Sequence, residues 1–245
     1  NHPMELNIWR APTDNDMYIK QEWKKAHYDA AYTRAYHIEV LQNKHGVLIM
    51  EHVAVVADTV QKILDVKMTW KINEDGKIEA VIEAIKDKEF PDLPRFGIRM
   101  FLNKKMDEIT YFGMGPQESY RDKHQASCHG LFRSKVAQMH EDYIRPQENG
   151  SHYDCDYVEL TNGQCGIAAV SKNPFSFNAS VYTQEELERV SHNYELKESD
   201  STVFCMDYAM NGIGSNSCGP DVLDKYRFAE EAFQFQFELI PFVKG

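Results

Sequence analysis

Apolar and polar residues alternate over several stretches of this sequence, and this pattern constrains the fold more than any other feature. In residues 77–85, Ile78, Ala80, Ile82 and Ala84 occupy every second position. Because successive side chains of a strand point to opposite faces, such alternation predicts a strand with one buried face. Further strands are predicted at 47–57, 59–72, 96–102, 166–170, 175–182, 202–210 and 231–242. The sequence therefore predicts an all-β fold of two packed antiparallel sheets, forming a single domain over residues 1–245.

Turn and helix signals separate these runs. Glu74-Asp75-Gly76 predicts a hairpin turn, because Gly adopts positive φ without a steric cost. Residues 16–29 favour a short helix. Thr183, followed by Glu186 three residues later, is typical of a helix N-terminus, so a second short helix is expected at 183–192.

Charge and cysteine content exclude several classes of partner. The net charge is −11, from 27 basic and 38 acidic residues, which argues against nucleic acid because phosphate binding depends on clustered Lys and Arg. No apolar run is long enough to cross a bilayer. The five cysteines form no CxxC pair, so a reducing cytoplasmic environment is the simpler expectation. Neutral ligands such as sugars remain compatible with this composition.

Three polar stretches rich in Gly, Asn and aromatic residues lie between the predicted strands, at 7–16, 111–122 and 211–221. Glycine there indicates positive φ or a close approach of backbone to another group. Short polar side chains can bond either to nearby backbone or to ligand hydroxyls. On the residues alone, tight turns between strands are favoured over a binding site.

Four motifs follow one another along the chain: RAPxDND at 10–16, YxGxGPxExYxD at 111–122, PxENG at 146–150 and GxGxxSCxP at 212–220. In this order they closely resemble the last domain of family 2 β-galactosidases, over residues 3–241. The resemblance implies a large two-sheet antiparallel supersandwich related in architecture to galactose mutarotases. It also implies a parent glycoside hydrolase that releases terminal non-reducing β-D-galactosyl residues from galactosides such as lactose.

The resemblance further implies that this chain carries no catalytic residue and binds no metal or other cofactor. In the family, the catalytic glutamates and the ligands of magnesium and sodium ions lie on the barrel or other domains that precede this one. The expected partner is therefore those domains, or a large subunit that carries them. In the family, this domain supplies a wall of the sugar site.

The site residues implied by the resemblance fall into two groups. Cys218 stands where the family places a Trp that stacks on the sugar, with Ser217 and Asn216 beside it, and His27 stands where a mobile loop begins with Gly. The second group is expected to face the active site or a domain interface and consists of Arg10, Asp14, Asn15 and Asp16.

Other polar clusters are interpreted as structural. A retaining glycosidase needs two carboxyl groups roughly 5 Å apart, and spacing alone brings together no two of the loop-like acids Asp14, Asp16, Glu118, Glu148, Asp207 and Asp221. The spacings of His124, Cys128 and His129, and of His152, Asp154, Cys155 and Asp156, match no metal-ligand pattern.

Two alternative functions stay open: a free-standing carbohydrate-binding module, and an aldose epimerase of the mutarotase type, which needs a His acid and a Glu base in one pocket. The chain begins at Asn1 rather than Met. A cut fragment and a natural small subunit are therefore both possible.

Overall fold

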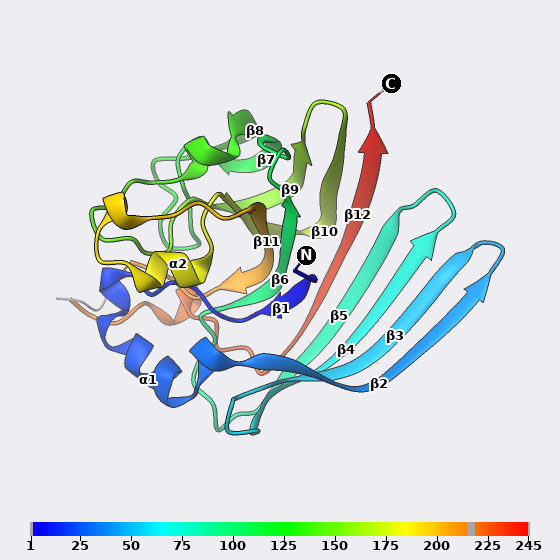
Figure 1. The fold of residues 1–245 in the computed structure, drawn as a ribbon. Coiled ribbons are helices and arrows are strands. Elements are labelled where there is room, and N and C mark those ends of the chain that lie inside the picture. The colour runs from blue at the N-terminus through cyan, green and yellow to red at the C-terminus, as the bar shows by residue number, and fades with distance from the viewer. Residues whose placement is uncertain (1, 215–218, 245) are drawn as a thin grey trace.

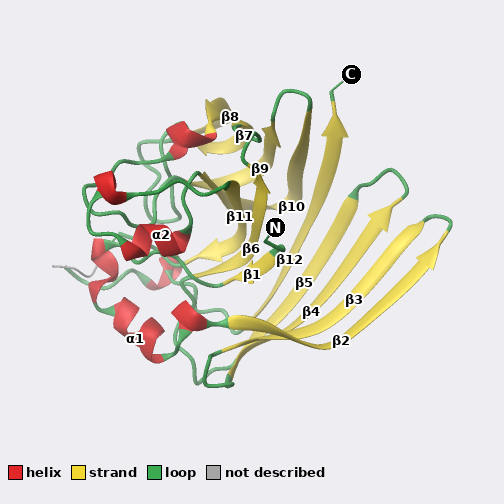
Figure 2. Cartoon of the chain, viewed as in Figure 1, coloured by secondary structure: helices red, strands yellow, loops and turns green. Residues whose placement is uncertain are grey.

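The computed structural model describes residues 2–214 and 219–244. The strands in these residues are β1 (Glu5–Asn7), β2 (Tyr32–Asn43), β3 (Gly46–Val56), β4 (Lys62–Asn73), β5 (Ile78–Lys86), β6 (Arg95–Asn103), β7 (Glu108–Gly115), β8 (Cys128–Lys135), β9 (Ser151–Thr161), β10 (Cys165–Ser180), β11 (Ser201–Met210) and β12 (Ala232–Val243). The helices are α1 (Ile19–Lys25) and α2 (Gln184–Arg189), with 3-10 turns at Asp14–Met17, Tyr28–Ala30, Val136–Met139, Asn193–Glu195 and Asp224–Tyr226. Figure 2 shows that the helices and longer loops gather at one end of the strands.

All strand pairs are antiparallel and form one sheet in the order β1-β6-β11-β10-β12-β5-β4-β3-β2, with β9, β7 and β8 branching from β10. The sheet curls over on itself (Figure 1). Phe96 of β6 packs against Phe233 of β12 with ring centroids 4.8 Å apart, although two strands separate them in the ladder. The prediction of an all-β antiparallel fold is confirmed, and its two layers are halves of one continuous sheet.

Local alternation places the core as expected. In β12, Phe233, Phe235, Phe237 and Leu239 are buried, while the residues between them are more exposed. The predicted turn after β4 is present, with Gly76 at φ +83°. Thr183 caps α2 by accepting a hydrogen bond from the Glu186 N–H at 3.1 Å, so the second helix signal is also confirmed. The region 16–29 forms α1 flanked by 3-10 turns.

The interpretation of 111–122 as a loop was wrong for its first half. Residues Tyr111–Gly115 belong to β7, which pairs with both β8 and β9. Gly113 allows β7 to lie close to Cys155 of β9, because a Cβ at this position would be only 2.2 Å from the Cys155 sulfur. Strands β1, β2, β8 and β9 were not predicted either, and Asn7, placed in the polar stretch 7–16, is the last residue of β1.

Candidate functional site

Arg10 ties the beginning of the chain to the start of the 211–221 loop. Its guanidinium is fully buried and donates to the Asn211 carbonyl at 2.5 Å and to the Gly212 carbonyl at 3.2 Å. The same group makes a two-point ion pair with Asp16, at 2.8 and 3.2 Å, and lies over the Trp23 ring. Arg10 therefore acts as a structural anchor whose charge does not reach solvent.

The rest of the first motif continues this anchorage. Asp16 accepts from the Thr13 N–H at 2.9 Å, so both of its oxygens are used within the motif. Asn15 donates from Nδ2 to the Ile213 carbonyl at 2.9 Å. Asp14 is exposed and contacts Gln147 of the PxENG stretch. Of the four residues in the second predicted group, Arg10 and Asn15 bond the backbone of residues 211–213, which form the base of the 211–221 loop, and Asp16 holds Arg10 in place. The fourth residue, Asp14, faces solvent.

Asp122, the last residue of the second motif, holds the same loop from the opposite side. Its carboxylate accepts from the Ile213 N–H at 3.1 Å and the Gly214 N–H at 2.7 Å. A Cβ at Gly212 would lie 2.7 Å from the Asp122 Oδ2, so only glycine lets the loop pass this close. The motif pattern contains Asp122, but it was not among the residues singled out for the site, because its partners lie about ninety positions away.

Asn216, Ser217 and Cys218, the predicted sugar-contacting residues, lie outside the described residues. Beside the described part of the loop there is a hollow of about 350 Å³. Tyr18, Gly212, Asp221 and Arg227 are among the residues that line it. Tyr18 is 54% exposed. An exposed ring beside polar groups can pack on one face of a sugar and bond its hydroxyl groups.

His27 follows α1 in the left-handed conformation, with φ 56° and ψ 35°. Glycine adopts this conformation without cost, whereas a residue with a Cβ is strained there. The backbone at this position thus has the geometry that a Gly would favour, which is the residue the resemblance led us to expect. The His27 ring lies 2.8 Å from the Asp58 carboxylate, in the turn between β3 and β4, so the side chain ties two loops together.

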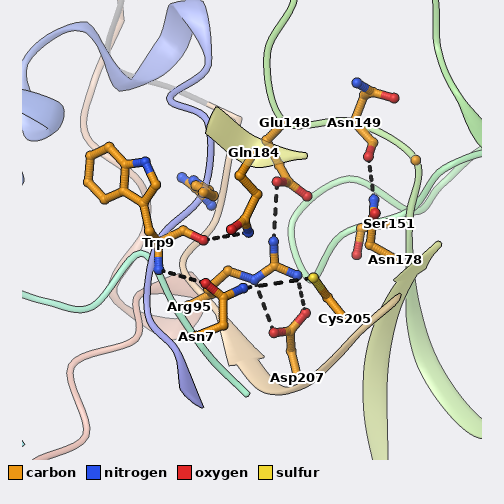
Figure 3. Close-up of polar contacts among 12 residues, drawn as sticks. Asn7, Trp9, Arg95, Glu148, Asn149, Ser151, Asn178, Gln184, Cys205 and Asp207 are labelled. Atoms are coloured by element: carbon orange, nitrogen blue, oxygen red, sulfur yellow. Dashed lines mark hydrogen bonds and ion pairs between the residues drawn. The ribbon is translucent and has the colours of Figure 1, made fainter. Parts of the chain in front are cut away.

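Arg95, Glu148 and Asp207 form a buried ionic cluster (Figure 3). Arg95 pairs through two nitrogens with Asp207, and its third nitrogen lies 3.3 Å from Glu148 Oε2. Asp207 is a strand residue rather than a loop residue. Burial raises the pKa of Glu148 to about 7 against the opposing effect of Arg95, and Glu148 Oε1 has no hydrogen-bond partner among the described residues. The structure thus brings together two of the acids considered in the sequence.

These two carboxyl groups do not form a glycosidase pair. Asp207 is 0% and Glu148 3% exposed, so a sugar has no access to either. Glu118, a third candidate acid, is also buried and accepts from the Gly150 N–H at 2.8 Å and from Tyr143. All three carboxyls are used to join strand ends and loops.

His124, His129, His152 and Cys155 each hydrogen-bond a backbone carbonyl. His152 is buried, hydrogen-bonds the Met114 carbonyl at 3.0 Å, and has its pKa lowered to about 4 by burial. Burial raises the pKa of the Cys155 thiol. Within residues 2–214 and 219–244, no three or more His, Cys, Asp or Glu side chains are grouped so that they could hold a metal ion. No helix in that part of the chain is long and apolar enough to cross a membrane.

Comparison with known proteins gives the family. The family model described as "Beta galactosidase small chain" matches residues 2–239. A β-galactosidase of Actinobacillus pleuropneumoniae is 48% identical over 97% of this chain and 23% of its own length. One from Staphylococcus xylosus is 37% identical over 95% and 23%. This chain therefore spans about a quarter of the length of these relatives.

Among solved structures, a galactose mutarotase-like protein from Lactobacillus casei matches 99% of this chain and 84% of its own, with 11% identity and a TM-score of 0.42. A superposition this loose says nothing about the site. The match of one family model over nearly the whole length, with the two bacterial relatives, is decisive: this chain belongs to the β-galactosidase small-chain family.

Proposed function

We propose that this chain is the non-catalytic C-terminal part of a β-galactosidase whose other part hydrolyses terminal non-reducing β-D-galactosyl residues, with galactosides such as lactose as substrates. Its similarity to about a quarter of the length of proteins named β-galactosidase supports this. The inaccessibility of Glu118, Glu148 and Asp207 is in agreement, since a retaining glycosidase needs two carboxyl groups in contact with the sugar.

The role of this part is to hold the 211–221 loop as a wall of the sugar site in the parent enzyme. One observation carries this proposal: two stretches far from the loop in sequence, represented by Arg10 and Asn15 in the first and by Asp122 in the second, bond the backbone of 211–214 from opposite sides. Binding residues are commonly presented on loops that a rigid scaffold positions. A mere turn between β11 and β12 would need no such convergent support.

Magnesium and sodium ions belong to the remainder of the parent enzyme in this proposal. The described residues offer no group of side chains that fits such an ion, and no step through a metal is assigned to this chain. The partner is the rest of the enzyme, either as the same polypeptide or as a large subunit. A cytoplasmic location is proposed because Cys128, Cys155, Cys165 and Cys205 are all free thiols.

Activity measurements test the first part of the proposal. The 245-residue chain alone should not hydrolyse a chromogenic galactoside, whereas the parent enzyme should. Turnover by the purified chain that is lost on changing one of its own acids would refute the proposal. Calorimetric binding of lactose to the chain alone would favour a carbohydrate-binding module, and faster anomerisation of galactose in polarimetry would favour an epimerase.

The Asp122→Asn variant of the parent enzyme tests the loop. In this variant, one of the two hydrogen bonds from the Ile213 and Gly214 N–H groups is lost, and the other no longer goes to a charged group. The free energy that holds 211–214 in this position should fall by about 1–3 kcal/mol. The affinity for a sugar acceptor such as glucose should fall and KM should rise, while thermal stability changes little. Asp200→Asn, at an exposed position, is the control and should change neither. An Asp122→Asn enzyme with unaltered acceptor affinity would show that the loop is only a turn.

The Cys218→Trp variant of the parent enzyme tests the predicted sugar platform. A thiol offers far less contact area than an indole. The substitution should therefore increase glucose-acceptor affinity and leave recognition of the galactosyl group unchanged. Equal acceptor affinity in the two enzymes would contradict the assignment of position 218 to the sugar site.

A further inference from the structure

The curled sheet is open between its two outermost strands. Strands β1 and β2 end the hydrogen-bonded order, and residues of both line one apolar groove of about 780 Å³. Figure 1 shows that β2–β5 lean away from β1 and β6. Leu6 of β1 and Ile38 of β2 both line the groove, together with Trp70, Ile78 and Met100 from the strands between them in the sheet order.

Strand β2 is exposed along its whole length. All twelve of its residues are exposed, and among the described strands it pairs with β3 alone. Ile38 and Val40 are 53% and 57% exposed, and Val40 pairs with Ile49, a residue of the groove. A long edge strand with apolar side chains is an aggregation hazard unless something covers it.

The beginning of the chain already leads into this groove. Pro3 and Met4 line it, and the His2 ring lies 4.7 Å from Phe101 of β6. Strand β1 adds only three residues to β6. Polypeptide joined to this end would be held at the groove by its covalent link, so its local concentration there would be high.

We propose that the polypeptide preceding Asn1 in the parent enzyme adds at least one β-strand to the free edge of β2 and packs its apolar face into the groove, closing the sheet. This inference rests on the family, whose matched members are about four times as long as this chain, and not on the proposed activity. A second copy of the chain fits less well. It would offer another β2 edge, which extends the sheet but leaves the groove unfilled.

Cross-linking in the parent enzyme identifies the occupant. A benzophenone amino acid in place of Val40 should, after irradiation and mass spectrometry, capture a peptide from the segment of the same polypeptide directly before Asn1. The same amino acid in place of Leu131, which is 62% exposed on β8, a further edge strand that pairs with β7 alone among the described strands, is the matched control and should not capture that segment. Capture at position 40 of a second copy, of a distant domain, or of nothing would overturn the proposal.

Hydrogen–deuterium exchange gives a second readout that needs no substitution. Amides of β2 that have no partner in β3 should exchange about 100-fold more slowly in the parent enzyme than in the 245-residue chain. The slowing should exceed that of β8. Equal exchange of β2 in the two proteins would refute strand addition whether or not the enzyme is active.

Discussion

Replacing Glu148 by Gln should stabilise the chain at alkaline pH while changing its stability little near pH 5. Glu148 is buried beside Arg95, but the two-point pairing of that guanidinium goes to Asp207. Glu148 therefore meets Arg95 through a single contact, while Asp207 makes the closer two-point pair. Burial is the largest effect and raises the pKa of Glu148 from 4.5 to about 7, against the lowering effect of Arg95 and Arg10, and the nearby Asp207 adds to the rise.

The magnitude follows from that pKa. Below pH 4.5 the carboxyl is protonated in both folded and unfolded chains, so it makes no difference to stability. Between pH 4.5 and about 7 the unfolded chain releases the proton and the folded chain keeps it, so stability falls as the pH rises. At about 1.4 kcal/mol for each pH unit, the loss attributable to Glu148 reaches about 3 kcal/mol above pH 7.

Urea denaturation followed by circular dichroism measures the effect. The free energy of unfolding of Glu148→Gln minus that of the wild type should increase by about 2.5 kcal/mol between pH 5 and pH 8.5. Glu83→Gln, at an exposed strand position, is the control and should differ from wild type by less than about 0.5 kcal/mol throughout. A difference for Glu148→Gln that does not depend on pH, or that decreases toward alkaline pH, would show that Glu148 is ionised in the folded chain and that the reasoning is wrong.

Substitutions at three other positions probe the scaffold by the same denaturation assay. Arg10→Met should cost about 3–5 kcal/mol, because it leaves a buried carboxylate unpaired; exposed Arg133→Met is the control, and a similarly small cost for both would contradict the anchoring role. His27→Gly should change stability by less than about 1 kcal/mol, whereas His27→Val should destabilise, since a β-branched residue is disfavoured at φ 56°; the reverse order would refute strain at this position. Phe96→Ala should cost about 3–5 kcal/mol, and a cost below about 1 kcal/mol would mean that the two layers of the sheet do not depend on this contact.

Local pattern predicted those elements whose partners are close in sequence. Strands β3, β4 and β5 follow one another through short turns, so the alternation of each one and the glycine of the turn at residue 76 suffice to predict them. Strand β7 escaped prediction because its glycines suggest a loop. Gly113 is required by contact with Cys155, forty-two positions away, and no local pattern reveals that.

The sequence alone determined the all-β class, the family and the stretches that matter, because alternation and motif order are properties of residues along the chain. Only the tertiary structure showed that Arg10 reaches Asn211, two hundred positions away, and that Glu148 and Asp207 meet on Arg95. The physical reason is that a buried charge is stable only where partners converge on it. That convergence depends on how the sheet curls, and the curl is set by packing between strands that no local pattern connects.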